Sequence, residues 1–249
     1  MTVIFVHGNP ETDALWDPLV EVLGRGDVVR LSPPGFGAPL PDGWPGTFVA
    51  YRDWLEDELT RFDDPVDLVG HDWGGGHVIN AVMHRPELVR SWASDDVGIF
   101  DQDYVWHDLA QVWQTPGDGE ALVDTMMTNA TEPQWIEQLV QGGLTPQVAT
   151  KIAAGAGPEM GRAILLLYRS ATGPAWAEAG AGLERAAAKP GLALLATADT
   201  YVGSEDIRRR AAERAGANSV VLEGLGHWWM VQDPARGAAA LTDFWDSLD

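Results

Sequence analysis

An aspartate at a sharp strand-to-helix turn is the residue best placed to act as a nucleophile. Residues 66–76 read VDLVGHDWGGG: an apolar strand, glycines around Asp72, then a helix. A turn this tight holds its central residue at positive φ and lifts that side chain above the sheet, where helix N–H groups point. The simpler alternative is that Asp72 only caps the helix, a common role for aspartate. This segment alone leaves both open.

A loop after the first strand could supply an oxyanion hole for such a nucleophile. His7-Gly8-Asn9-Pro10 directly follows the apolar start of the chain. A backbone N–H from a loop in this position pairs with the N–H of the residue after the nucleophile. Those two donors would be Asn9 and Trp73. An ordinary Gly-Pro turn would look the same.

A histidine near the C-terminus is the candidate base. GLGHWW at residues 224–229 follows the last apolar strand and contains His227. A single histidine on a glycine-flanked loop is usually structural. However, the chain order Asp72, Asp199, His227 matches nucleophile, acid and base in one well-known type of catalytic triad.

The surrounding pattern predicts a parallel sheet with helices on both faces, because short apolar strands alternate with amphipathic helices. The expected strands are Thr2–Val6, Val28–Leu31, Val66–Val69, Val89–Ser94, Leu192–Ala196 and Ser219–Leu222. The expected helices are Ala14–Leu23, Phe48–Phe62, His77–Arg85, Glu205–Ala215 and Ala235–Ser247.

The alternation stops within residues 98–188, a tryptophan-rich stretch with several helical periodicities and repeated prolines. We interpret this stretch as short helices forming a lid over the strand ends, inserted after the fourth strand. Residues 1–97 and 189–249 then form the core. An unrelated helical domain is the alternative.

Composition narrows the function classes. The chain has 249 residues and a net charge of −21, which disfavours binding to nucleic acid or to anionic membranes. The absence of cysteine excludes disulfides, thiolate metal sites and a cysteine nucleophile. No apolar run is long enough to span a membrane, and the N-terminus is typical of a strand and not of a signal peptide. A cytoplasmic protein without a cofactor is expected, and a homodimer is compatible with the sequence.

These motifs resemble the α/β-hydrolase superfamily over essentially the whole chain. Within it, HGNPET, GHDWGG and GHWWMVQDP resemble segments of the branch with an aspartate nucleophile, the epoxide hydrolases and haloalkane dehalogenases. In these families two strands usually precede the HG-x-P strand, which here opens the chain. The resemblance therefore implies an α/β-hydrolase fold with a sheet shortened at its N-terminal edge. It also implies a small apolar organic substrate and water as reactants.

The resemblance leaves two positions for the acid that orients His227. Asp199, after the strand Leu192–Ala196, holds the usual place. Asp95 or Asp96, at the end of VRSWASDD, stands where some dehalogenases carry their acid. We favour Asp199.

The leaving group distinguishes the two candidate reactions. Tyr168 in ILLLYRSA resembles a lid tyrosine that hydrogen-bonds the epoxide oxygen in epoxide hydrolases. The usual first lid tyrosine is absent, and Tyr104 is a weak substitute. The side chains of Asn9 and Trp73 resemble instead the halide-binding pair of one dehalogenase group. Epoxide hydrolysis ranks first and haloalkane dehalogenation second.

Other interpretations carry less weight. Gly74–Gly76 stand where haloacid-specific enzymes place arginines, so haloacid chemistry is disfavoured. A metal site built from His71, Asp72 and His77 lacks the spacing that metal ligands on one helix show. A non-catalytic ligand-binding member of this fold is the remaining alternative.

Overall fold

A six-stranded parallel sheet organises the computed structural model, which describes residues 1–248. The strand order is β2-β1-β3-β4-β5-β6, and every pairing is parallel. The strands are β1 (Val3–Val6), β2 (Val28–Leu31), β3 (Val66–Gly70), β4 (Val89–Ser94), β5 (Gly191–Ala196) and β6 (Ala217–Leu222). Because all strands run the same way, their carboxyl ends meet at one edge, where ligands of such sheets bind.

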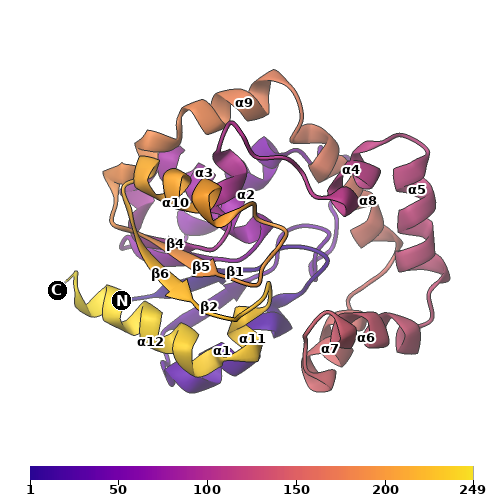
Figure 1. Ribbon diagram of the computed structural model, residues 1–249, viewed down its shortest axis with the longest axis horizontal. Coiled ribbons are helices and arrows are strands. Elements are labelled where there is room, and N and C mark those ends of the chain that lie inside the picture. The colour runs from indigo at the N-terminus through magenta and orange to yellow at the C-terminus, as the bar shows by residue number, and fades with distance from the viewer. Residues whose placement is uncertain (249) are drawn as a thin grey trace.

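Helices cover both faces of this sheet (Figure 1). One face carries α1 (Asp17–Leu23), α11 (Trp229–Gln232) and α12 (Pro234–Asp246), and the other α2 (Phe48–Leu59), α3 (Trp73–His84) and α10 (Glu205–Arg214). Successive strand residues point to opposite faces, so Val3 and Phe5 join one apolar cluster while Ile4 and Val6 join the other. A strand covered on both sides needs apolar residues throughout, which explains the apolar run of β1.

The predicted fold class is confirmed, and most expected elements begin or end within a few residues of the observed ones. The largest difference is α3, which begins at Trp73 and not at His77. Its first turn contains Gly74 and Gly75, which the sequence analysis assigned to the turn. Both positions need glycine because a Cβ on Gly74 would clash with the Val6 carbonyl, and one on Gly75 with the Ser94 hydroxyl. The expected helix from Ala14 begins as a 3₁₀ turn, Asp13–Trp16.

The segment between β4 and β5 is helical, as expected. It contains α4 (Asp108–Gln114), α5 (Asp118–Val123), α6 (Glu132–Gln141), α7 (Pro146–Ala153), α8 (Pro158–Ser170) and α9 (Pro174–Ala181). Two 3₁₀ segments, Val97–Phe100 and Leu183–Ala188, and a π-helical segment, Asp124–Asn129, complete it. Proline stands at the start of α7, α8 and α9, where its missing N–H costs nothing. Helices α4 to α8 stand together at the side of the sheet remote from both termini (Figure 1).

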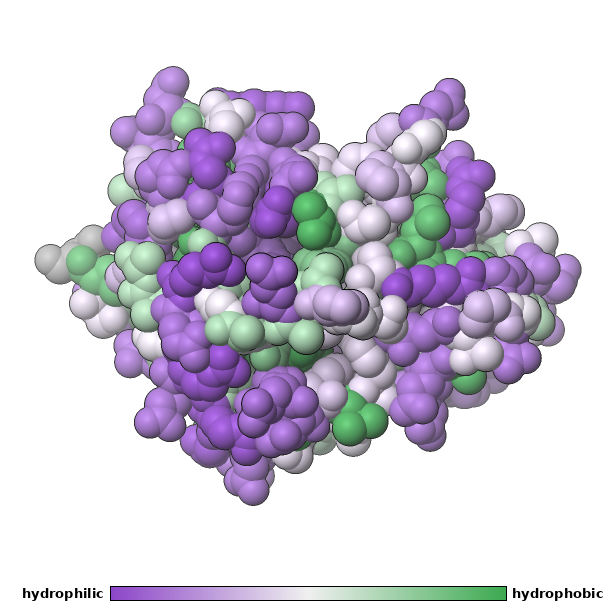
Figure 2. Space-filling model, turned by 90° about the horizontal axis from the view of Figure 1, so that it is seen from above, coloured by the Kyte–Doolittle hydropathy of each residue, from purple (hydrophilic) through white to green (hydrophobic). Residues whose placement is uncertain are grey.

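Figure 2 shows a largely hydrophilic face with apolar residues visible in a hollow near its middle. Among residues 1–248, no helix combines the length and the apolar character needed to cross a bilayer.

Candidate active site

Asp72 occupies a strained turn between β3 and α3. Its φ is 50° and its ψ is −132°, and it is the only residue other than glycine with positive φ in the described chain. Such a conformation costs about 1–3 kcal/mol and persists only where the surroundings enforce it. A Cβ on Gly70 would lie 2.5 Å from the Gly75 Cα, so strand and helix approach too closely for side chains there. The predicted backbone of the elbow is therefore confirmed.

The Asp72 carboxyl lies against the loop after β1 and the ring of His227. It makes no side-chain capping hydrogen bond to α3, so helix capping does not explain this residue. Instead, the backbone N–H of Asn9 donates to its Oδ1 at 2.9 Å, and the Nε2 of His227 lies 3.9 Å from its Oδ2. Gly8 packs against the same carboxyl, and a Cβ there would overlap it.

His227 is oriented by Asp199. The Nδ1–H of the histidine donates to Asp199 Oδ2 at 2.9 Å, and the backbone N–H of Tyr201 donates to the other carboxyl oxygen at 2.8 Å. The hydrogen bond leaves the Nε2 of His227 facing Asp72. The structure thus brings together all three residues of the predicted order.

The two rival acids, Asp95 and Asp96, make no hydrogen bond to His227 in the described part of the chain. Asp95 accepts hydrogen bonds from the backbone N–H of Asp72 (3.0 Å), the ring of His71 (2.5 Å) and the indole of Trp229 (2.6 Å). These bonds fix the turn and do not reach His227. Asp96 is buried, and its Oδ1 has no hydrogen-bond partner within residues 1–248.

A buried ion-pair network lies beneath the site, and the sequence analysis missed it. Glu11 accepts from the ring of His71 at 3.2 Å, from the indole of Trp228 at 2.6 Å and from the backbone N–H of Gly8 at 3.2 Å. His71 therefore lies between two carboxylates, Glu11 and Asp95. Burial alone would lower the pKa of His71, but these two charges raise it well above its usual value.

The titration behaviour of the three candidate residues follows from burial and from their neighbours. Burial raises the pKa of Asp72 to about 6, although the His227 charge acts against it. Burial would also raise the pKa of Asp199, but the charge and hydrogen bond of His227 outweigh burial and lower it. Conversely, burial would lower the pKa of His227, and Asp199 raises it.

The three residues suggested as metal ligands do not form one cluster. His77 stacks on Tyr51, with ring centroids 4.9 Å apart. Within the described residues, the side chains close enough to share an ion are Glu11, His71 and His227, whose potential ligand atoms lie within 4.8 Å of one another. Both ring nitrogens of His71 are already engaged with carboxylates.

A small cavity of about 170 Å³ connects Asp72 to the inserted helices. Its walls are Asn9, Pro10, Asp72, His107, Leu109, Trp113, Met126, Trp135, Gln138, Leu139, Gly142, Tyr168, Tyr201, His227 and Trp228. Tyr168 on α8 is 2% exposed, so its ring faces the cavity and not the surface. Burial, reinforced by the nearby Asp72 charge, raises the pKa of Tyr168 well above its usual value.

Of the two side chains suggested as a halide-binding pair, Asn9 is in that cavity wall and Trp73 is beside it. Both polar atoms of the Asn9 carboxamide are buried without a partner in the described structure. The Trp73 ring packs edge-on against Tyr168 at 5.4 Å between centroids.

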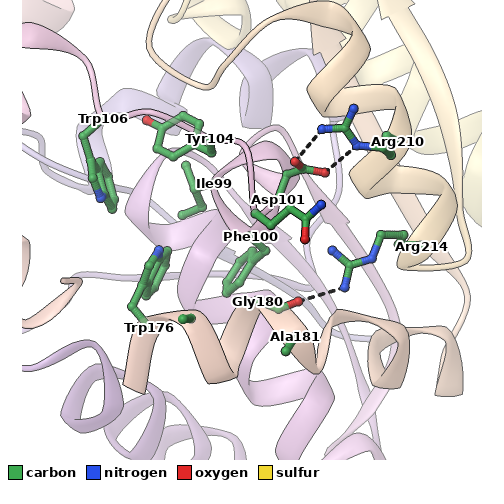
Figure 3. Close-up of a pocket in the computed structure, with 12 residues that line it drawn as sticks. Ile99, Phe100, Asp101, Tyr104, Trp106, Trp176, Gly180, Ala181, Arg210 and Arg214 are labelled. Atoms are coloured by element: carbon green, nitrogen blue, oxygen red, sulfur yellow. Dashed lines mark hydrogen bonds and ion pairs between the residues drawn. The ribbon is translucent and has the colours of Figure 1, made fainter. Parts of the chain in front are cut away.

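A larger cavity of about 650 Å³ lies between Trp106, Trp176 and Arg210, among other residues (Figure 3). Trp106 lines it and stacks on Trp73 at 5.6 Å. Tyr104 also lines it, and its hydroxyl donates to the Tyr201 carbonyl at 2.7 Å, so this hydroxyl is not available to a ligand beside Asp72. The cavity's Arg210 is paired with Asp101 at 2.6 Å.

Comparisons with known proteins agree with the fold. A family model described as the alpha/beta hydrolase family matches residues 3–240. An epoxide hydrolase of Caballeronia sordidicola is 26% identical over 71% of this chain and 56% of its own length. A haloalkane dehalogenase of Sphingobium indicum is 31% identical over 29% of this chain and 27% of its own length. The chain thus spans about half or less of the curated relatives it matches.

Solved structures show the same architecture. A loop variant of a haloalkane dehalogenase from Bradyrhizobium elkanii superposes with a TM-score of 0.73 at 20% identity, covering 99% of this chain and 90% of that one. An E-2-(acetamidomethylene)succinate hydrolase superposes with a TM-score of 0.75 at 18% identity, covering 98% and 91%. At such identities the likeness concerns the fold alone.

Proposed function

The chain belongs to the α/β hydrolase family, and from that premise we propose that it is an epoxide hydrolase whose nucleophile is the Asp72 carboxylate. The observation that carries the proposal is the surroundings of this carboxyl. The Asn9 N–H lies 2.9 Å from one oxygen and the His227 Nε2 lies 3.9 Å from the other, in a cavity that Tyr168 also lines. The similarity to an epoxide hydrolase supports the same choice.

Ring opening is the first step. An Asp72 oxygen forms a bond to an epoxide carbon, the ring C–O bond breaks, and its electron pair stays on the epoxide oxygen. The Tyr168 hydroxyl gives that oxygen a proton, which leaves a hydroxyalkyl ester and a phenolate. A carboxylate needs no base before it attacks, so His227 takes no part in this step.

Ester hydrolysis is the second step. The Nε2 of His227 takes a proton from water, and the hydroxide adds to the Asp72 carboxyl carbon. The backbone N–H groups of Asn9 and Trp73 stabilise the resulting oxyanion. Collapse expels the diol oxygen, which receives the proton from His227. The Asp72 acid then loses its proton, and Tyr168 regains one.

The substrate is a small, apolar epoxide. Aromatic and aliphatic side chains make up most of the cavity wall, and a volume of about 170 Å³ is below the usual range for drug-sized ligands. The inserted helices supply Trp113, Trp135 and Tyr168 to this wall, which supports their role as a lid.

Trapping the ester tests this proposal. His227→Ala exposed to styrene oxide should gain the mass of one substrate molecule, located on the Asp72 peptide. Asp72→Asn is the matched control and should gain none. A His227→Ala protein that stays unmodified, or is modified at another residue, contradicts the mechanism.

Haloalkane dehalogenation is the second candidate. The unpartnered Asn9 carboxamide favours it, because a buried N–H donor could bind a departing halide. Measuring bromide release from a bromoalkane beside diol formation from styrene oxide separates the two reactions. Abolition of either activity by Asp72→Ala would also exclude a non-catalytic ligand-binding role.

A further inference from the structure

We infer that the Nε2–H of His107 is a second hydrogen-bond donor to the substrate oxygen, acting beside the Tyr168 hydroxyl. The inference rests on the proposed function, since it concerns the oxygen that ring opening leaves negative. Tyr104 cannot act as a second tyrosine donor, because its hydroxyl donates to the Tyr201 carbonyl. His107 would supply that second donor instead.

The position of His107 in its helix fixes the position of its ring proton. His107 is the N-cap of α4, and its Nδ1 accepts the backbone N–H of Ala110 at 3.2 Å. A ring nitrogen that accepts a hydrogen bond carries no proton, so the proton of the neutral ring is on Nε2. Burial lowers the pKa of His107 to about 4, and the His227 charge acts in the same direction, so the ring is neutral at pH 7.

The ring of His107 also faces the reacting groups. It lines the same cavity as Asp72, Tyr168 and His227. The centroid of the His107 ring lies 6.3 Å from the Tyr168 centroid and 5.0 Å from the Tyr201 centroid. The Tyr201 ring in turn packs against the His227 ring, with 4.9 Å between their centroids. Within residues 1–248, the Nε2 of His107 has no hydrogen-bond partner. This atom is also not fully buried. It is therefore free to donate to a molecule in the cavity.

The chemistry needs such a donor. The electron pair of the broken ring bond is left on the epoxide oxygen, so the negative charge moves from the Asp72 carboxylate to that oxygen as the ester forms. A neutral N–H shares this developing charge through a hydrogen bond and keeps its own proton, whereas Tyr168 transfers one. Removing one donor of this kind from an oxyanion site typically slows catalysis about 100-fold.

Two substitutions separate this role from simple helix capping. Asparagine is a good N-cap residue, but its amide is too short to reach as far as Nε2. Glutamine caps poorly, but its amide nitrogen lies about as far from the backbone as Nε2. The inference expects His107→Asn to keep the melting temperature and lose about 100-fold in single-turnover ring opening. His107→Gln should lose some thermal stability and retain most of the ring-opening rate.

His84→Gln is the control, because His84 lies at the surface and pairs with Glu56 away from the cavity. It should leave both rates unchanged. Ester hydrolysis should also be unaffected in both His107 variants. A capping role alone predicts the opposite order, with His107→Asn fully active and His107→Gln impaired, and that result would overturn the inference.

A binding experiment tests the His107 donor even if epoxides are not substrates. Phenylacetamide offers a neutral carbonyl oxygen to the same donors, and its binding can be followed by tryptophan fluorescence. His107→Asn and Tyr168→Phe should each weaken binding about fivefold, which is typical for the loss of one neutral hydrogen bond. If wild-type protein opens no epoxide but these losses appear, the donor pair stands and the proposed function falls. Equal affinity in wild type and His107→Asn rejects the donor, while abolition of turnover by Asp72→Asn would still support the proposed function.

Discussion

The Nε2 of His227 lies 3.9 Å from the Oδ2 of Asp72, although the two residues come from loops after different, non-adjacent strands of the sheet. In the proposed mechanism, this separation leaves the carboxyl free to attack a substrate first. It also keeps the imidazole close enough to deliver a hydroxide to the resulting ester. The division of labour between the two residues leads to separate expectations for the two steps.

Removing the charge of Asp199 should impair only the second step. Asp199→Asn replaces the charged carboxylate beside the Nδ1 of His227 with a neutral amide, which no longer stabilises the protonated ring, so ester hydrolysis should slow about 10³- to 10⁴-fold while ring opening continues. The matched variant is Asp96→Asn, which changes a buried carboxyl without a bond to His227. Single-turnover kinetics measure both rates. Equal defects in the two variants would show that Asp199 is not the orienting acid.

The pH dependence of ring opening should reflect Asp72. Its pKa is raised to about 6, and only the ionised carboxylate attacks, so the single-turnover rate should fall as the pH drops through about 6. The charge of His227 lowers this pKa, so the midpoint should move upward in His227→Ala. A rate that stays constant down to pH 4 would be incompatible with the protonation state assigned to Asp72.

Glu11 should control stability in acid. Burial would raise its pKa, but His71 holds it at about 2 in the folded protein, against an ordinary value of 4.5. A lowered folded-state pKa gives stability that is present above pH 4.5 and is lost as the pH falls towards 2. The shift corresponds to about 3 kcal/mol. In urea titrations, Glu11→Gln should flatten the decline of the unfolding free energy over this range. An unchanged slope would mean that the ion pair does not form.

The turn around Asp72 should tolerate no side chain at Gly74. Gly74→Ala places a Cβ against the Val6 carbonyl, and overpacking of this kind costs about 1–3 kcal/mol or more. Gly26→Ala is the control, since a Cβ at Gly26 meets no atom within 4 Å. Denaturant midpoints compare the two, and similar values for both variants would show that the turn can relax.

Local patterns were sufficient to predict the sheet, the insertion and the elbow. The glycines around Asp72 are required because the strand, the helix and the adjacent strands approach closely there. The spacing of these glycines in the sequence therefore predicts the elbow. The choice of acid was harder, because Asp95, Asp96 and Asp199 all follow strand ends. In the folded structure, Asp199 is the one of these three that lies within hydrogen-bond distance of His227.

The network of Glu11, His71 and Asp95 could not be derived from any one segment. Its members come from three separate strand ends, and each has a plausible local explanation. The signals that could have suggested it were an acid directly after the HGNP loop and a histidine directly before Asp72. Similarly, the N-cap position of His107 depends on where α4 begins, which composition does not determine.

Asp95, which accepts a hydrogen bond from the Asp72 backbone N–H, comes before the inserted helices in the chain, and Asp199 comes after them. Everything that bends the chain at Asp72 and aims His227 is thus completed by residues outside the insertion. Resculpting those helices while keeping the ring-opening donors His107 and Tyr168 should redirect selectivity towards bulkier or more polar epoxides, with the attack geometry inherited intact. The remaining cavity-facing side chains of the insertion are in that sense the positions open to engineering.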